Sequence, residues 1–263
     1  MNRFSLIGLK KMPSAETITL SIVSHGQGAL VHRFFQDLQT YCAGEDLTVI
    51  LTLNVAESLP FQPEAFSFPL RICSNRHPRG FGQNHNAALQ NAPGNNLCLV
   101  NPDIRLTQNP FPALLTRLQT IPRLGLVAPL VVNRNHDPED NARKLPTPYS
   151  LIGRYLGLKH LDYPIGQELL TPDWVAGMFV LLPRNVFQDV GGFDERYYMY
   201  YEDFNLCLRL RLAGYEIGLD PQVSVVHEAR RESHRNLVYL KWHLTSILRM
   251  FGSATYYRYL LGR

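Results

Sequence analysis

The chain has 263 residues, 45% hydrophobic and 18% charged, a composition that excludes intrinsic disorder. Lys and Arg number 26 against 22 Asp and Glu, and the resulting net charge of +4 is too mild to indicate a class of partner. We expect no membrane-spanning segment and no secretory signal, because no apolar run approaches the lengths these require. The widely spaced cysteines are expected to be buried free thiols of a reducing compartment.

The first half of the chain alternates between strand-like and helix-like segments. Strands are predicted at residues 17–24, 47–53, 70–74, 97–100 and 125–131. Helices are predicted at 29–41, 83–91 and 112–120, the second of them entered from a Gly-Phe-Gly turn. This β-α-β-α order predicts an α/β fold, with a mostly parallel sheet covered by helices on both faces.

The rest of the chain follows a different pattern. Residues 133–171 are rich in Pro, Asn and charge and are expected to form a long loop or lid. Strands are then predicted at 178–182, 215–219 and 223–226, with a helix at 202–213. Residues 1–228 carry 19 basic and 21 acidic residues, whereas residues 229–263 carry seven basic and one acidic. We therefore expect a near-neutral domain at 1–228 joined to a basic extension at 229–263.

Polar residues follow three of the predicted parallel strands. Ser24-His25-Gly26 follows the first, Asn54 the second, and Asn101-Pro102-Asp103 the most apolar one. In an open parallel sheet, ligands bind beyond the carboxyl ends of the strands. These residues are therefore candidates for a binding crevice, although Asp103 can equally cap the segment that follows it.

Two further segments carry chemistry suited to a ligand. Residues 76–86 include arginines that can meet phosphate, such as Arg79, and glycines such as Gly82 that let the backbone approach a ligand. Residues 191–203 join an aromatic run to Glu202-Asp203 at a helix start, where the dipole favours anions. The aromatic run can form a sugar-stacking wall, but the same pattern also fits an acidic helix terminus beside core residues.

The order of these motifs resembles the family 2 glycosyltransferases, and within them the bacterial rhamnosyltransferase branch. The motifs that carry the resemblance are Asn84-x-Asn86, Asn101-Pro102-Asp103, Asp173-Trp174-Val175-Ala176-Gly177, Gly191-Gly192-Phe193-Asp194, Met199-Tyr200-Tyr201-Glu202-Asp203, His227 and Lys241-Trp242-His243-Leu244. The resemblance implies a GT-A fold with a Rossmann-like central sheet. It also implies a nucleotide-sugar-binding half at about 17–130 and an acceptor and catalytic half at about 131–228, ahead of the extension.

The resemblance implies roles for the acidic residues. Asp203 matches the catalytic base, which deprotonates the acceptor hydroxyl for attack with inversion, and Glu202 is expected to position or hold the acceptor. Asp103 falls in the family's Asp-x-Asp motif and would coordinate Mg²⁺ or Mn²⁺, with His227 reaching the metal or the diphosphate. Asn101 replaces one Asp of that motif, which weakens the expected metal site.

The implied donor is a nucleotide sugar. Its natural identity for this branch is dTDP-rhamnose, and a UDP-hexose or a galactofuranose donor is the alternative. Leu53 stands where many relatives read the base with an Asp, so base recognition is expected from Asn54 or from Ser24-His25-Gly26. The remaining predicted donor contacts are Arg79, Gly82, Asn86, Asn101 and Gly177.

The implied acceptor is a polyprenyl-diphosphate-linked or polysaccharide sugar at the inner face of the bacterial cytoplasmic membrane. Trp174 is predicted to stack on that sugar, with Asp173 beside it, although core packing explains Trp174 nearly as well. A catalytically silent sugar-nucleotide-binding protein is the alternative from another class. The oligomeric state is left open.

The basic extension shows helical periodicity. Its apolar residues recur at three- and four-residue steps, namely Leu237, Leu240, Leu244, Ile247, Leu248 and Phe251. A basic amphipathic helix with nearby tyrosines suits an anionic membrane surface, and it can also pack on the domain with a solvated basic side. No nucleic-acid-binding motif accompanies the charge, so we expect no nucleic-acid partner.

Overall fold

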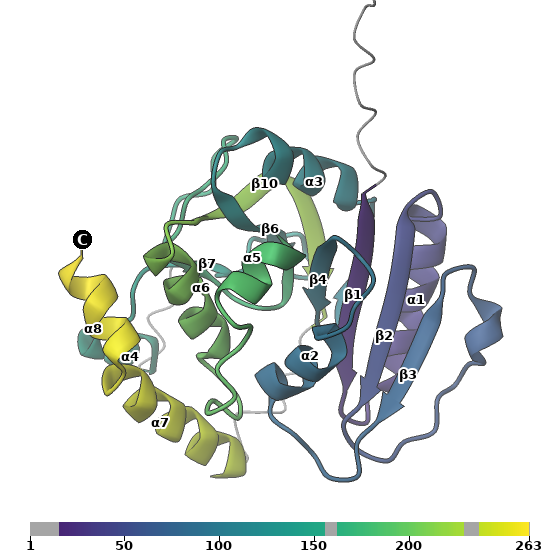
Figure 1. Cartoon of the computed structure of the whole chain (residues 1–263), viewed down its shortest axis with the longest axis horizontal. Helices are drawn as coiled ribbons and strands as arrows, with labels where there is room; N and C mark the ends of the chain where they lie inside the picture. The colour runs from purple at the N-terminus through teal and green to yellow at the C-terminus, as the bar shows by residue number, and fades with distance from the viewer. Residues whose placement is uncertain (1–15, 156–161, 229–236, 263) are drawn as a thin grey trace, which may run out of the picture.

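The structure is a computed structural model that describes residues 16–155, 162–228 and 237–262. The expected loop at 133–171 and the basic extension at 229–263 lie partly outside these residues. Within them, an α/β fold surrounds one large sheet, and the chain ends in two helices at the edge farthest from β3 (Figure 1).

The sheet has the strand order β3-β2-β1-β4-β9-β6-β10-β5. Its strands are β1 (Thr17–Ser24), β2 (Asp46–Leu53), β3 (Leu70–Ser74), β4 (Asn96–Val100), β5 (Ile104–Arg105), β6 (Leu124–Val132), β9 (Phe179–Pro183) and β10 (Glu216–His227). Strands β1 to β4 run parallel, as do β6 and β10, whereas β9 lies antiparallel between β4 and β6. The predicted mostly parallel sheet is confirmed.

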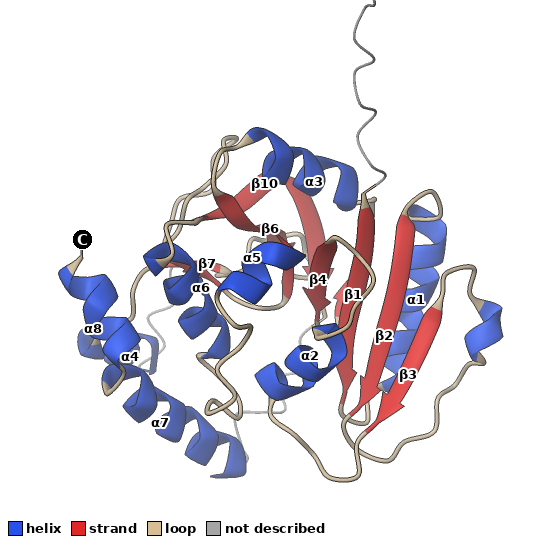
Figure 2. Ribbon diagram, viewed as in Figure 1, coloured by secondary structure: helices blue, strands red, loops and turns tan. Residues whose placement is uncertain are grey.

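Helices cover both faces of this sheet (Figure 2). The helices of the described residues are α1 (Gly28–Tyr41), η1 (Pro63–Ala65), α2 (Phe81–Leu89), α3 (Phe111–Thr120), α4 (Pro148–Tyr155), α5 (Arg184–Asp189), α6 (Glu202–Leu212), α7 (Leu237–Phe251) and α8 (Ala254–Leu261). Alternate residues of β4 face opposite sides, so Cys98 belongs to the core under α1 and α3, and Leu97 to the core under α2, α5 and α6.

Three predicted elements differ from the structure. The predicted Gly-Phe-Gly turn is instead the start of α2, which begins at Phe81. Gly82 allows this helix to pack closely on Phe193, because an added Cβ would lie only 2.7 Å from Phe193 Cβ. The strands predicted at 215–219 and 223–226 form the single strand β10, which is irregular between Asp220 and Ser224, around Pro221. The expected loop at 133–171 contains α4 and the short strand β7 (Ala142–Arg143), which pairs with β8 (Trp174–Val175).

The loop before α6 is held by a buried network. Gly191 and Gly192 have positive φ, and a Cβ on Gly192 would lie 2.5 Å from Asn86 Oδ1, so only glycine fits there. The amide of Asn86 donates to Phe193 O at 2.9 Å and accepts from Phe193 N at 2.8 Å. From α6, the Arg209 guanidinium donates to the carbonyls of Val190 and Gly192. These bonds fix the approach of the chain to Glu202.

Replacing Arg209 with Met is expected to lower the free energy of unfolding by about 1–3 kcal/mol, because it leaves loop carbonyls without their charged donor. Urea unfolding measures this change. The control is Arg71→Met on β3, where Arg71 is exposed. Equal unfolding midpoints for both variants would show that the Arg209 network does not hold the loop.

Candidate active site

One cavity of about 940 Å³ opens at the carboxyl ends of the parallel strands. His25 and Gly26 follow β1, Asn54 follows β2, and Asn101 to Asp103 follow β4; all of them line this cavity. The prediction that these strand ends meet at one crevice is therefore confirmed. Glu202, Asp203, Trp174 and Gly177 line the same cavity from the other half of the domain.

Asn54 shapes the wall beyond β2. Its side-chain oxygen accepts from Arg79 N–H at 2.8 Å, and its Nδ2 donates to Arg79 O at 3.0 Å. The Arg79 side chain lines the cavity, is exposed, and forms no ion pair with any carboxylate among the described residues. Its charge is therefore free to meet an anionic ligand.

Asp103 and His227 lie next to each other. The strand β5 pairs antiparallel with the end of β10, and this pairing places His227 opposite Ile104, the residue after Asp103. His227 Nε2 is 3.3 Å from Asp103 Oδ2, and its Nδ1 is 2.7 Å from Glu139 Oε2. Burial lowers the pKa of His227, but the hydrogen bonds to Asp103 and Glu139 outweigh it and raise this pKa to about 9. Asp103 lines the cavity, whereas His227 does not.

The Asp103 pair fits a divalent cation in its chemistry. Asp103 Oδ1 is buried and has no hydrogen-bond partner, so it has a free acceptor for a metal. A cation at His227 Nε2 would displace the proton that Nε2 shares with Asp103. Glu139 on Nδ1 would then orient the ring, as carboxylates commonly do for metal-bound histidines. The described residues contain no cluster of three His, Cys, Asp or Glu side chains able to hold a metal. A cation here would therefore depend on substrate oxygens, as Mg²⁺ often does at phosphate sites.

The carboxylate of Asp203 is fixed by two backbone donors. Its Oδ2 accepts from Gly177 N–H at 2.9 Å, and its Oδ1 accepts from Phe204 N–H at 2.7 Å. A Cβ on Gly177 would lie 3.2 Å from Asp203 Cβ, so glycine permits this close approach. Burial raises the pKa of Asp203, while the hydrogen bond from Gly177 opposes that rise by stabilising the ionised form.

Glu202 is more deeply buried than Asp203. Its side chain is 6% exposed, and its Oε2 has no hydrogen-bond partner. Burial and the neighbouring Asp203 raise the pKa of Glu202 well above the usual range for a carboxyl. Both carboxyls have a raised pKa, but two backbone N–H groups stabilise ionised Asp203, whereas Glu202 Oε2 has no partner. Asp203 is therefore the better candidate for a base.

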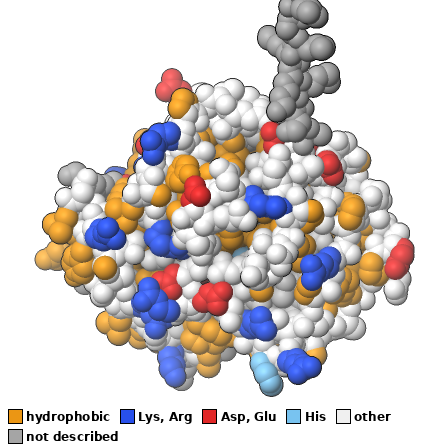
Figure 3. Space-filling view, viewed as in Figure 1, with side chains coloured by type: hydrophobic (Ala, Val, Ile, Leu, Met, Phe, Trp, Pro, Cys, Tyr) orange, Lys and Arg blue, Asp and Glu red, His pale blue; other side chains and the backbone are white. Residues whose placement is uncertain are grey.

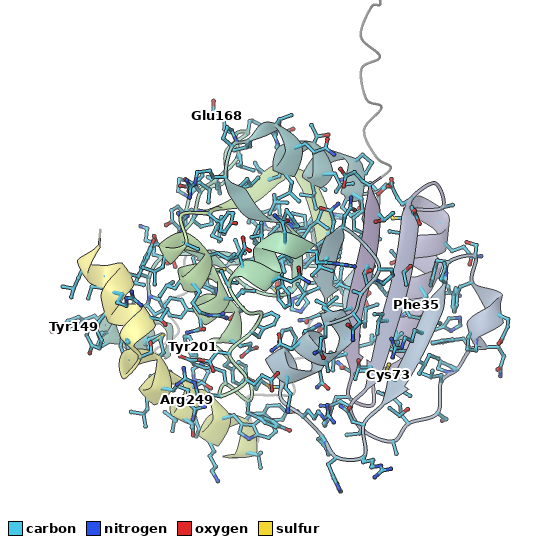
Figure 4. All side chains as sticks on the ribbon, viewed as in Figure 1. Phe35, Cys73, Tyr149, Glu168, Tyr201 and Arg249 are labelled. Atoms are coloured by element: carbon cyan, nitrogen blue, oxygen red, sulfur yellow. The ribbon has the colours of Figure 1, made fainter. Side chains whose placement is uncertain are left out.

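The backbone in front of these carboxyls is strained. Tyr200 and Tyr201 both adopt left-handed conformations, with φ of 72° and 65°. Each costs about 1–3 kcal/mol for a non-glycine residue, and such strain persists only where packing enforces it. The Tyr201 ring is buried against Phe204 of α6 and His243 of α7 (Figure 4).

Replacing Glu202 with Gln is expected to stabilise the protein more at about pH 8 than at about pH 5. The folded-state pKa of Glu202 lies above its unfolded pKa of about 4.3. Wild type therefore loses stability as the pH rises from the unfolded pKa to the folded pKa. Gln does not titrate and avoids that loss. Urea unfolding at both pH values tests this, with exposed Glu64→Gln as the control. An equal effect of Glu202→Gln at both pH values would contradict the assignment.

Five predicted ligand contacts lie outside the cavity lining. One is His227, described above, and the other four have structural roles. The Ser24 hydroxyl accepts from Gln27 N–H at 3.1 Å before α1. Gly82 and Asn86 hold the α2 contact with Phe193 described above. Asp173 is buried and accepts from Leu145 N–H at 2.7 Å. Short polar residues that bind the backbone cannot be distinguished by sequence from residues that bind a ligand.

Trp174 packs in the core and also lines the cavity, so its stacking on the acceptor stays a prediction. It lines the cavity, yet it is only 4% exposed and packs its edge against Phe204. The Arg143 guanidinium lies 4.9 Å from the centre of the Trp174 ring and also lines the cavity. Sequence reasoning missed Arg143, because only the pairing of β7 with β8 brings it to the site.

Further cavity residues missed by the sequence predictions come from α7, namely Tyr239, Trp242 and His243. Trp242 and His243 belong to a motif that carries the family resemblance, and this was the one available signal. The same cavity is also lined by Phe81, Asn84 and the aromatic run that includes Tyr198 and Tyr200.

The strand order and the cavity at the strand ends, with Asp103 on one side and Glu202-Asp203 on the other, define the fold class as GT-A. This is the class predicted from the sequence. Among solved structures, the fold is similar to GalNAc-T7 with UDP, GalNAc and Mn²⁺. The TM-score is 0.65 at 15% identity, over 84% of this chain and 44% of that one. No protein-family model matches the chain.

Two sequence relatives are rhamnosyltransferases by name. The chain is 27% identical over 250 residues to rhamnosyltransferase WbbL of Escherichia coli K12, covering 88% of this chain and 91% of the relative. It is 30% identical over 148 residues to the N-acetylglucosaminyl-diphospho-decaprenol L-rhamnosyltransferase of Mycobacterium tuberculosis H37Rv, covering 52% of this chain. That match spans about half of the mycobacterial protein, 48% of its length. These relatives confirm the resemblance to family 2 glycosyltransferases of the rhamnosyltransferase branch.

Proposed function

We propose that this protein is a glycosyltransferase that moves a sugar from a nucleoside diphosphate to a sugar hydroxyl, with inversion at the anomeric carbon. The observation that carries the proposal is the Asp203 carboxylate, held by Gly177 N–H in the same cavity as Asp103 and Arg79. Asp203 can accept a proton, Arg79 can bind a diphosphate, and Asp103 can bind the cation that accompanies a diphosphate.

In the proposed reaction, the acceptor oxygen attacks the anomeric carbon while the bond from that carbon to the diphosphate breaks. Asp203 takes the hydroxyl proton, and the nucleoside diphosphate leaves with the bonding electrons. A single displacement of this kind inverts the anomeric configuration. Glu202 lines the cavity beside Asp203, and its raised pKa favours the protonated form, which would donate a hydrogen bond to the acceptor.

On the donor side, Arg79 supplies a cation to the diphosphate, and Asp103 and His227 would hold Mg²⁺ or Mn²⁺. A bound divalent cation would neutralise charge on the leaving diphosphate. Mn²⁺ in the GalNAc-T7 structure supports a divalent metal and does not distinguish it from Mg²⁺. His25 lies beyond β1, where it would contact the nucleoside, whereas both polar atoms of the Asn54 side chain already bind the Arg79 backbone.

The donor we favour is dTDP-rhamnose, because both relatives are named rhamnosyltransferases. A thermal-shift screen against dTDP-rhamnose, UDP-hexoses and UDP-galactofuranose, with and without Mn²⁺, tests this choice. A ligand that binds only the folded state raises the apparent stability with its occupancy. The largest shift is expected with dTDP-rhamnose and Mn²⁺. A larger shift with a UDP-sugar would replace the donor, and no shift with any nucleotide sugar would overturn the proposed function.

The acceptor we propose is a saccharide linked to a polyprenyl diphosphate, for a cell-wall or O-antigen polysaccharide. The printed name of the mycobacterial relative specifies such a lipid-linked acceptor. Among the described residues, none of the helices is long and apolar enough to cross a bilayer. We propose that the protein reaches the lipid-linked sugar through one of its surfaces, at the inner face of the cytoplasmic membrane.

Helices α7 and α8 offer such a surface. Hydrophobic side chains gather with Lys and Arg at the edge of the molecule that these helices form (Figure 3). We call its exposed apolar side chains the α7–α8 apolar surface: Leu240, Leu244, Leu248, Tyr257, Leu260 and Leu261. Lys241 and Arg258 are exposed on the same helices, and residues 237–263 include no Asp or Glu. This combination fits an anionic lipid surface.

Replacing Leu244 and Leu248 with Ser is expected to weaken binding to phosphatidylglycerol–phosphatidylcholine vesicles roughly tenfold or more, because each leucine loses apolar burial in the lipid. Both side chains are exposed, at 52% and 75%, so the fold should be retained. Vesicle co-sedimentation measures the effect, with Leu212→Ser on α6 as the control. Unchanged binding by the double variant would sink the membrane proposal.

A further inference from the structure

Helix α7 is firmly docked on the domain by the face opposite its exposed leucines. Ser246 Oγ donates to Met199 O at 2.8 Å, and Met250 is completely buried. The Arg249 guanidinium lies 5.7 Å from the ring centre of Tyr197. This inner face is therefore anchored to the aromatic loop that leads to Glu202 and Asp203.

The first turns of the same face form part of the cavity wall. Tyr239 and Trp242 are both partly exposed and line the cavity beside Tyr198. The Trp242 ring centre lies 4.6 Å from that of Tyr198 and 5.2 Å from that of Tyr239. Three aromatic rings from two distant parts of the chain thus form one cluster with free surface toward the cavity.

The cluster continues toward the proposed base. His243, the next residue of α7, lies 5.1 Å from the Tyr200 ring and 5.6 Å from the Tyr201 ring, centre to centre. Tyr201 is the residue immediately before Glu202 and Asp203. The nucleoside end of the cavity is built instead by the residues after β1 and β2. The Tyr198 carbonyl also accepts from Phe81 N–H at 2.8 Å, at the start of α2. A ligand group held by the cluster would therefore share the cavity with Asp203 and Arg79.

The chemistry of the cluster selects an uncharged ring. Tyr198, Tyr239 and Trp242 offer aromatic faces, which bind the apolar face of a pyranose, and hydroxyl or indole groups, which bind its hydroxyls. We propose that these three residues form a stacking subsite for a pyranose ring of the acceptor, so that α7 contributes to acceptor selection. This inference rests on the proposed glycosyl transfer and adds the acceptor site to it.

Steady-state kinetics test the subsite with short-chain alkyl diphosphates of N-acetylglucosamine, galactose and glucose as acceptor probes. Trp242→Ala and Tyr239→Ala are each expected to raise the acceptor KM about tenfold, equivalent to about 1.4 kcal/mol, with the donor KM unchanged. Trp242→Phe keeps a ring and should recover most of the affinity. The matched control is Tyr41→Ala on α1, an exposed tyrosine far along the chain from the site. An unchanged acceptor KM in Trp242→Ala and Tyr239→Ala would overturn the subsite.

A binding measurement tests the same subsite without turnover. The chain has two tryptophans, so Trp174→Phe leaves Trp242 as the only indole. Its fluorescence is expected to change on titration with the acceptor probes and to stay unchanged with dTDP alone. A response to dTDP and none to any probe would overturn the subsite. If wild type transfers sugar but the Trp242 fluorescence does not change with any probe, the subsite is wrong and the proposed function stands. If no sugar is transferred from any donor, the proposed function itself is wrong.

Discussion

Asp203→Asn is expected to lower kcat for sugar transfer by about 10²- to 10⁴-fold, the range associated with a general base. The amide cannot take the proton of the acceptor hydroxyl. Its single oxygen can accept from Gly177 N–H or from Phe204 N–H but not from both, so the unfolding midpoint of the variant is measured beside its activity. Transfer kinetics with dTDP-rhamnose and an acceptor probe measure the loss, and Asp46→Asn at an exposed position on β2 is the control.

The same variant separates catalysis from donor binding. Asp203 lies on α6, whereas the proposed diphosphate contacts Arg79 and Asp103 come from other elements of the cavity. The thermal shift produced by the donor should therefore be unchanged in Asp203→Asn. Full transfer activity in this variant would refute the base assignment, and loss of donor binding would place Asp203 on the donor side instead.

Asp103→Asn is expected to weaken donor binding in the presence of Mn²⁺ by at least about 100-fold. Residues that merely support metal ligands cost about 10–100-fold when replaced, and a direct ligand should cost more. Asn keeps the size of the side chain but removes the charge from Oδ1, the buried atom without a partner.

Isothermal titration of the protein with dTDP, with and without Mn²⁺, measures this loss directly. The exposed Asp46→Asn variant again controls for a general effect of charge. Asp103→Asn should bind dTDP equally weakly with and without Mn²⁺. A gain in dTDP affinity from Mn²⁺ equal to that of wild type would remove Asp103 from the metal site.

Much of the sheet is predictable because its strands are short apolar runs with clear ends. β4 is buried along its whole length and is followed by Asn101. Both the strand and the polar residue that follows its carboxyl end can therefore be predicted from the sequence. A buried run does not reveal strand direction, however. Nothing in residues 179–183 distinguishes the antiparallel β9 from a parallel strand.

The face of α7 that meets the domain could not be read from hydrophobic periodicity. The periodic residues Leu240, Leu244 and Leu248 are exposed, whereas Trp242 and Ser246 face the domain. Of the other periodic residues, Ile247 and Phe251 pack against the core, so the predicted apolar stripe is divided between the domain and the solvent. The extension thus has one face packed on the domain, as one of the two expectations held, and one exposed face.

The strained approach to the carboxyls is a second feature beyond sequence reasoning. Tyrosine has no preference for positive φ, so nothing in the run Tyr200-Tyr201 announces two left-handed residues. Packing against α7 and α6 enforces them. The motif identified Glu202 and Asp203, but their different environments depend on this packing.

The central claim is sugar transfer from a nucleotide sugar, and product analysis tests it most directly. Wild type, Mn²⁺, dTDP-rhamnose and the alkyl-diphosphate N-acetylglucosamine probe are incubated together, and the product is examined by mass spectrometry and NMR. The account predicts a probe that has gained one deoxyhexose, with an anomeric configuration opposite to that of the donor. A product that retains the donor configuration would contradict the single displacement with Asp203 as base. The absence of any glycosylated product across the full donor and acceptor panels would contradict the function itself.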